Sequence, residues 1–444
     1  MSQDLCKLSA VEVAKLTRSG QLKVEDYAKA LIARVEGRDP VVHAWAYFNP
    51  EVILKSARAL DALPKEKRGP LHGVAVGVKD VIYTKDMPTQ QYSPIYKDDH
   101  PQLDAAVVLS LRSMGALIFG KTHTTEFATC QKGPPTCNPH DPSRTAGGSS
   151  SGSGAAVGDF QVPLALGTQT GGSTIRPASY NGVYALKPTW NAISREGLKV
   201  YSLTCDTVGL YSRSIEDLEL LCEIFNLVDD NPPPSTPLSL AGAKFGFVKT
   251  HVWSKAEPSV IDIWGKAKEF LTEAGAEVEE VELPKVFDNM TTWHRNILHM
   301  EGYSSFHGDY LSSPEQLDPW VIKHAVNEGK TTRKEHLESL DEIAKLRPVV
   351  DSIASKYTAL ITPSVTGEPP ILEEPLRFTG DASFNLMWTV LHLPVINIPG
   401  FKGPNGLPIG LSLIAPRYHE QDLLRTSHAV AETFAKGGWK LQQG

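Results

Sequence analysis

The stretch that decides the fold is Gly73-Val-Ala-Val-Gly-Val-Lys-Asp-Val-Ile82. It is almost continuously apolar and β-branched, which is typical of a strand buried on both faces of a sheet. One cation, Lys79, interrupts this run. A buried ammonium must be paired or lose its proton. Lys79 is therefore either a structural residue, reaching solvent at an edge or pairing with Asp80, or a desolvated lysine that can act as a base.

Helical and strand-like patterns alternate on both sides of this stretch. Helices are expected before it at 9–20, 24–35 and 50–63, the first opening with a capping box of Ser9 and Glu12 and the second followed by Gly37. Interleaved strands and helices predict an α/β fold with a mostly parallel sheet covered by helices on both faces. Further strands are expected at 116–120, 163–167, 182–186, 243–248, 277–283, 359–361, 395–398 and 409–414, and further helices at 103–114, 155–159, 214–225, 260–274 and 419–434.

The expected organisation is one large domain over residues 1–444. It comprises a helical N-terminal segment (1–65), a core that carries the chemistry (70–228), a proline-rich linker within the domain (229–240) and a C-terminal half (241–444). The linker contains the sequence DDNPPPSTP, whose consecutive prolines favour an extended spacer. Within the C-terminal half, the helical and aromatic region 286–350 is where we expect substrate selection.

The composition excludes several classes of protein. With 41% hydrophobic and 21% charged residues, the chain is neither disordered nor fibrous. A net charge of -7 argues against nucleic acid as a partner. No apolar run reaches the ~18 residues of a membrane span, and no secretory signal is visible. Five widely spaced cysteines favour reduced thiols, so a cytoplasmic protein is expected.

The first glycine-rich segment is Ala146-Gly-Gly-Ser-Ser-Ser-Gly-Ser-Gly-Ala155, which by composition alone is also typical of a flexible linker. It lacks the lysine of a phosphate-binding P-loop, and its glycines have the wrong spacing for a dinucleotide loop. The nucleophile elbow G-x-S-x-G matches at 148–152, with Ser150 at its centre. That elbow should follow an apolar strand, whereas the residues before this match are typical of a loop.

The second segment is Gly167-Thr-Gln-Thr-Gly-Gly-Ser-Thr-Ile-Arg-Pro-Ala178, in which an expected strand leads into a tight turn. Two glycines before Ser173 allow consecutive backbone N–H groups to converge on one point. Such a nest can bind the oxyanion of a tetrahedral intermediate. A purely structural turn is the alternative interpretation.

Taken together and in this order, these pieces closely resemble the amidase signature family of serine hydrolases. The resemblance is strong over about residues 70–215 and weaker beyond. It implies one large α/β domain with a twisted mixed β-sheet between layers of helices. The matching motifs are GVKDV, GKTHTTEFA, AGGSSSGSGAAV, LALGTQTGGS and GVYALKPT, followed later by LPVINIPG and LPIGLSLIAP.

The resemblance implies a role for each matching position. Ser173 would be the nucleophile that forms the acyl-enzyme, Ser149 the bridging serine that follows a cis peptide, and Lys79 the neutral base. Lys79 would take the proton of Ser149 while Ser149 takes that of Ser173, and the reverse transfer would protonate the leaving amine. The backbone N–H groups that would form the oxyanion hole are those of Thr170, Gly171, Gly172 and Ser173.

Three positions depart from the family pattern. Gln169 stands where the family usually has aspartate, Arg176 lies three residues after the nucleophile instead of two, and Ser412 replaces a common glutamine. Gln169 and Arg176 would change the surroundings of the catalytic residues. These departures weaken identification with the transamidosome glutaminase subunit, and the family's substrate preference does not carry over.

We therefore expect an amidohydrolase that cleaves linear carboxylic amides to a carboxylate plus ammonia or an amine, with ester or carbamate hydrolysis as a side activity. The expected partner is a small amide substrate, without nucleic acid or membrane, and a homodimer is compatible with this interpretation. Two alternatives stay open: an α/β-hydrolase-type esterase that uses Ser150 with a distant His and Asp, and a partner-dependent amidotransferase subunit of the same fold. The side chains expected to line the substrate pocket are Met87, Tyr92, Cys130, Trp293 and Trp388.

No metal or organic cofactor follows from this mechanism. A zinc site could be imagined around one group of potential ligands, but its spacing matches neither a C-x-x-C ribbon nor H-E-x-x-H. That group consists of His123, Glu126, Cys130, Cys137 and His140.

Overall fold

The computed structural model describes residues 5–129 and 131–441. Its centre is a sheet in the order β1-β3-β2-β4-β6-β5-β10-β11-β9-β7-β8. The stretch that predicted the fold forms β2, Ala75–Lys79, which is buried along its whole length and pairs in parallel with β3 and β4. The strands are β1 (Trp45–Tyr47), β2 (Ala75–Lys79), β3 (Leu117–Thr122), β4 (Leu164–Gln169), β5 (Tyr184–Lys187), β6 (Thr207–Ser212), β7 (Lys244–Val248), β8 (Glu277–Val281), β9 (Ala359–Pro363), β10 (Val395–Lys402) and β11 (Pro408–Ile414).

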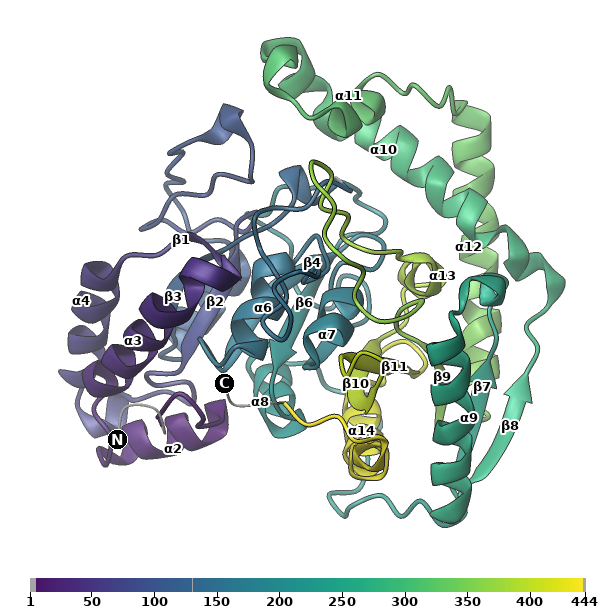
Figure 1. The fold of residues 1–444 in the computed structure, drawn as a ribbon, viewed down its shortest axis with the longest axis horizontal. Helices are drawn as coiled ribbons and strands as arrows, with labels where there is room; N and C mark the ends of the chain where they lie inside the picture. The colour runs from purple at the N-terminus through teal and green to yellow at the C-terminus, as the bar shows by residue number, and fades with distance from the viewer. Residues whose placement is uncertain (1–4, 130, 442–444) are drawn as a thin grey trace.

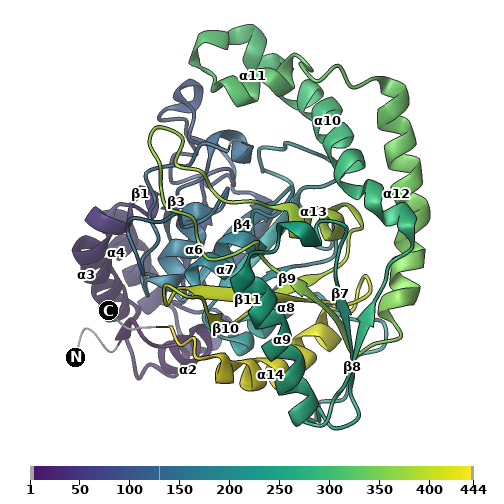
Figure 2. The same ribbon diagram turned by 45° about the vertical axis from the view of Figure 1, so that its right-hand side comes forward.

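Helices flank this sheet, as Figures 1 and 2 show from two sides. Helix α6 packs on β2 and β4, helix α7 on β10 and β11, and α14 on β10. The helices are α2 (Ala10–Ser19), α3 (Val24–Val42), α4 (Pro50–Asp61), α5 (Ala106–Ser113), α6 (Ser151–Gly158), α7 (Ile175–Asn181), α8 (Ile215–Ile224), α9 (Pro258–Glu273), α10 (Met290–Ser312), α11 (Pro319–Ala325), α12 (Arg333–Ala354), α13 (Ser383–Val390) and α14 (Glu420–Phe434). The α/β class and the mixed sheet implied by the family resemblance are confirmed.

The expectation of a mostly parallel sheet was wrong. Strands β2, β3 and β4 are parallel to one another, as are β7, β8 and β9, but the middle of the sheet is antiparallel. Strands β10 and β11 are joined by a turn of only a few residues, and such a short connection can join only antiparallel neighbours. Alternation of helix and strand along the chain therefore did not define strand direction in this middle part.

Two local expectations also need correction. Helix α3 does not end near residue 35 but continues through Gly37 and Pro40 to Val42. The second half of the glycine- and serine-rich tract, from Ser151 onward, belongs to the buried helix α6, and the tract is not a flexible linker. Its small residues are required by packing, since a Cβ at Gly152 would lie 2.1 Å from the backbone oxygen of Ala44 and 2.4 Å from the nitrogen of His123.

Helices α10 and α11, called here the roof helices, lie at one end of the molecule in both views, and the long helix α12 runs down from them (Figures 1 and 2). They contact each other closely, and α10 also packs against α12 and α13. This region corresponds to the helical and aromatic segment noted in the sequence. Within the described part of the chain, no helix is both long and apolar enough to cross a membrane.

Candidate active site

Lys79 stands at the end of β2 with its side chain fully buried. Its Nζ lies 2.8 Å from Ser149 Oγ and 2.6 Å from Thr168 Oγ1. The neighbouring Asp80 pairs instead with Lys121, at 3.3 Å. Desolvation lowers the pKa of Lys79 well below its ordinary value of 10.5, although the charge of Asp206 acts in the opposite direction. The amine is therefore held where a neutral form, able to accept a proton, is favoured.

Ser149 follows a cis peptide bond with Gly148. The carbonyl oxygen of Gly148 accepts a hydrogen bond from the guanidinium group of Arg176, so the departure at position 176 acts on the peptide that carries Ser149. Gly148 has no room for a side chain, because a Cβ there would lie 2.7 Å from Thr379. Close packing thus fixes the backbone that presents the Ser149 hydroxyl to Lys79.

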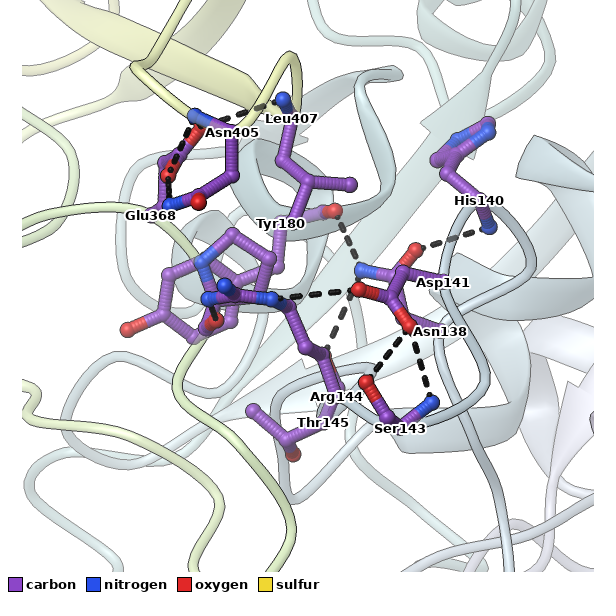
Figure 3. A network of polar contacts seen from close by, with 11 residues as sticks. Asn138, His140, Asp141, Ser143, Arg144, Thr145, Tyr180, Glu368, Asn405 and Leu407 are labelled. Atoms are coloured by element: carbon purple, nitrogen blue, oxygen red, sulfur yellow. Dashed lines mark hydrogen bonds and ion pairs between the residues drawn. The ribbon is translucent and has the colours of Figure 1, made fainter.

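The loop that leads to Ser149 is held by its own polar network (Figure 3). The side-chain amide of Asn138 donates to the backbone oxygens of Thr145, at 3.3 Å, and Tyr180, at 2.7 Å. Asp141 accepts from the guanidinium group of Arg144, which also donates to the backbone of the loop after β9. These contacts fasten the segment before Ser149 to both α7 and the loop after β9.

Ser173 lies in the turn between β4 and α7. Within the described residues, the backbone N–H groups of Gly171, Gly172 and Ser173 donate no hydrogen bond to the protein. Helix α13 packs directly on this turn, and a Cβ at Gly171 would lie 2.9 Å from Leu386. The glycines therefore serve close packing as well as the convergence of the N–H groups.

Ser149, Ser173 and the turn line one cavity of about 440 Å³. One part of its wall is the segment from Thr170 to Ser173 together with Arg176. Another part comes from the roof helices, with His294, Leu298, His299, Trp320 and His324. The loop after β9 and the start of α13 complete it, with Phe378, Thr379, Asp381 and Leu386 among the lining residues.

The charges around the cavity are largely balanced or suppressed. Lys255 and Asp381 form an ion pair at 3.0 Å. Burial lowers the pKa of His294 to about 4, and it also lowers the pKa values of His299 and His324, so these imidazoles are neutral at pH 7. The wall is therefore mainly uncharged, with Arg176 and Arg295 as further cations.

Four of the residues expected from the sequence to line the pocket are described by the structure, and none of the four lines the cavity that contains Ser173. Met87 belongs to the main hydrophobic core, Trp388 is buried in a second core, and Trp293 packs against that second core. Tyr92 lines a separate cavity of about 640 Å³. Cys130 lies outside the described residues.

Ser150, the centre of the alternative nucleophile elbow, is fully buried. Its Oγ donates to Thr168 O at 3.1 Å and accepts from Thr168 N at 3.2 Å. It is absent from the residues that line the cavity shared by Ser149 and Ser173. The Ser150 esterase alternative therefore lacks an accessible nucleophile.

Among the residues that the structure describes, no group of three or more His, Cys, Asp or Glu side chains could hold a metal ion.

The sequence interpretation missed four residues around the site. Thr168, whose hydroxyl contacts Lys79 Nζ, directly follows the predicted strand 163–167, and that position was the one signal that could have marked it. Asp206 is buried, which raises the pKa of its carboxyl group to about 6, and it accepts from Thr170 Oγ1 at 2.7 Å. His294 and Thr389 come from α10 and α13, far along the chain, and no local motif marks them.

The mixed sheet and a cavity that contains two serines, one of them beside a buried lysine, fit the class of serine hydrolases. A family model described as Amidase matches residues 26–424, so the chain belongs to the amidase family.

Solved structures and curated proteins agree with this assignment. A crystal structure of an amidase aligns with a TM-score of 0.85 and 26% identity, over 98% of this chain and 100% of that one. A glutamyl-tRNA(Gln) amidotransferase subunit from Salinispora arenicola is 37% identical over 303 residues, which are 63% of this chain. This chain covers only 62% of the length of that relative. The corresponding protein from an Exiguobacterium species is 29% identical over 96% of this chain and 97% of its own length.

Proposed function

We propose that this protein hydrolyses linear carboxylic amides to a carboxylate and ammonia or an amine, through an acyl-enzyme on Ser173. Lys79 acts as the neutral base and Ser149 as the bridge between Lys79 and Ser173. The observation that carries the proposal is the distance of 2.8 Å between the buried Lys79 Nζ and Ser149 Oγ, beside a cavity that also contains Ser173.

The proposed reaction has two stages. Ser173 Oγ attacks the amide carbonyl while its proton passes to Ser149, whose own proton passes to Lys79. The N–H groups from Thr170 to Ser173 stabilise the oxyanion, and the reverse transfer protonates the leaving amine. Water then attacks the acyl-enzyme by the same proton route and releases the carboxylate. Esters and carbamates present the same carbonyl geometry and are accepted as side substrates.

A substrate panel tests the proposal. Purified protein is incubated with chemically diverse amides, esters and carbamates, and the products are identified by mass spectrometry with Ser173→Ala as the blank. We expect amide cleavage that is lost in Ser173→Ala, Ser149→Ala and Lys79→Ala. Cleavage that survives Ser173→Ala would refute the assignment of the nucleophile.

A second candidate is a protein that acts only as one subunit of a larger complex. The curated relatives from Salinispora and Exiguobacterium are amidotransferase subunits, which supports it. The mainly uncharged wall of the cavity and the departures at Gln169 and Arg176 favour the independent amidase. Isolated protein that resists a serine-directed fluorophosphonate and cleaves no member of the panel would favour the partner-dependent candidate.

We propose further that the protein works in the cytoplasm on a small amide, without nucleic acid or membrane, and that a homodimer is compatible with this role. Cys137, Cys205 and Cys222 are free thiols among the described residues, which is consistent with a reducing compartment. The net charge of -7 gives no basis for nucleic-acid binding.

A further inference from the structure

The three carbonyl groups of the turn before Ser173 are each held by a hydrogen bond from a residue outside the turn. Thr170 O lies 2.9 Å from His294 Nε2, Gly171 O accepts from Thr389 Oγ1 at 2.6 Å, and Gly172 O accepts from the backbone N–H of Arg176 at 2.9 Å. In a trans peptide the carbonyl and the following N–H point in opposite directions. Each anchored carbonyl therefore directs the next N–H away from its anchor, and these are the N–H groups of Gly171, Gly172 and Ser173.

The direction of the hydrogen bonds around Gln169 is fixed by its partners. Its Oε1 accepts from the backbone N–H groups of Thr174, at 2.9 Å, and Ile175, at 3.1 Å. The other end of the amide, Nε2, must then be the donor to Thr389 Oγ1, at 3.0 Å. Since Thr389 Oγ1 accepts this bond, its single proton is free to go to a carbonyl, and Gly171 O is the nearer of its two carbonyl partners.

We propose that Gln169 and Thr389 form a positioning relay that aims the Gly172 N–H at the reacting carbonyl oxygen. Both side chains are fully buried and neither lines the cavity, so they act through the turn and do not touch substrate. The inference rests on the proposed function, because it assigns these N–H groups to the oxyanion of the amide reaction.

The relay also accounts for the departure at position 169. The aspartate implied by the family resemblance could accept from the N–H groups of Thr174 and Ile175, but an ionised carboxylate has no proton to donate to Thr389. A carboxylate would attract the Thr389 hydroxyl proton to itself and compete with Gly171 O for it. In this chain glutamine instead leaves that proton directed to the turn.

Matched variants of both residues test the relay. Thr389→Val has nearly the same shape without the hydroxyl, Thr389→Ser keeps the hydroxyl, and Gln169→Glu keeps the length and both acceptors but loses the donor. Two rates are measured for each variant: kcat on the fastest amide of the panel, and the rate at which a fluorophosphonate labels Ser173. Thermal unfolding shows whether each variant is folded.

Loss of an oxyanion donor lowers kcat by about 10²–10³-fold. A donor that is misdirected but still present should lower kcat by a smaller factor than a lost donor. We therefore expect Thr389→Val and Gln169→Glu each to lower kcat by about tenfold to a hundredfold and to change KM by no more than about twofold. Labelling of Ser173 should slow in parallel, and Thr389→Ser should stay close to wild type. The double variant Thr389→Val with Gln169→Glu should be no slower than the slower single variant, because both interrupt one pathway.

Wild-type rates in folded Thr389→Val or in folded Gln169→Glu would overturn the relay. An additive double variant, or a loss of rate in Thr389→Ser equal to that in Thr389→Val, would do the same. Wild-type protein that neither cleaves amides nor reacts with the fluorophosphonate would instead refute the proposed function. The two failures are therefore distinguishable.

Discussion

Lys79 and Lys187 are a matched pair that separates the chemical role of a buried amine from the cost of burying it. Both are fully buried in the same sheet, and desolvation lowers the pKa of each, that of Lys187 to about 7. Lys187 Nζ donates to Pro188 O at 2.8 Å, and Lys187 does not line the cavity shared by Ser149 and Ser173. Because general-base catalysis contributes about 10²–10⁴-fold, we expect Lys79→Met to lower kcat by that factor and Lys187→Met to leave it unchanged.

The same substitution at Lys187 should raise stability. Its pKa is about 7 in the folded chain against 10.5 for the free side chain, so between these values the unfolded state binds more protons. The wild-type free energy of unfolding therefore rises with pH across that window, and at pH 7 the buried lysine carries a cost on the order of 4 kcal/mol. Lys187→Met should remove most of this cost at pH 7, and its advantage should disappear above the pKa of the free side chain.

Both effects can be measured on the same three proteins. Amide cleavage is followed by mass spectrometry with Ser173→Ala as the blank, and urea unfolding is followed at neutral pH and at a pH above the pKa of free lysine. Lys79→Met that keeps more than about a tenth of wild-type kcat would refute the role of base. A loss of activity in Lys187→Met equal to that in Lys79→Met would show that activity depends on any buried lysine of the sheet. The inference that the Ser149 contact marks Lys79 as the base would then fail.

Three further outcomes are expected. Activity should rise with pH as Lys79 loses its proton. Because the charge of Asp206 raises the pKa of Lys79, Asp206→Asn should move this rise to lower pH in a pH–rate profile. A rate that is flat from about pH 5 to 9 would contradict the role of Lys79 as a neutral base. Ser150→Ala should keep fluorophosphonate labelling of Ser173 but unfold more easily, by about 1–2 kcal/mol for its lost contacts with the β4 backbone; absence of labelling would restore the elbow hypothesis. His294→Phe removes the donor to Thr170 O, so it should lower kcat by a larger factor than it changes KM. His294→Gln retains an N–H donor and should recover part of the lost kcat. Equal activity of His294→Phe and wild type would contradict the anchoring role of His294.

The parts of the fold and site that could be predicted are those encoded by neighbouring residues. The apolar run around Lys79 predicted β2, and the capping box at Ser9 predicted α2 with its end at Gly20. Lys79 and the turn before Ser173 were marked by their own sequence patterns, whereas Ser149 was assigned only through the family resemblance, because the G-x-S-x-G pattern pointed to Ser150. The proximity of Lys79 and Ser149, which are 70 positions apart, required the resemblance to a family as well as the motifs.

The remainder depended on contacts between distant segments. The Gly/Ser tract is typical of a linker in isolation and becomes part of α6 where it packs against α7 and the strands β4 and β2. The pocket wall is formed by the roof helices and the loop after β9, so large aromatic residues such as Trp293 and Trp388 gave no indication of which side chains face the cavity. His294 and Thr389 were invisible for the same reason.

The contact between His294 and Thr170 O joins helix α10, on one side of the cavity, to the turn before Ser173 on the other side. A substrate too large for the cavity would push α10 outward and stretch this hydrogen bond. The N–H groups of the turn would then point less accurately at the carbonyl oxygen of that substrate. Oversized compounds would then bind without being turned over efficiently. Selection of substrate by size would show itself in the speed of bond cleavage more than in affinity.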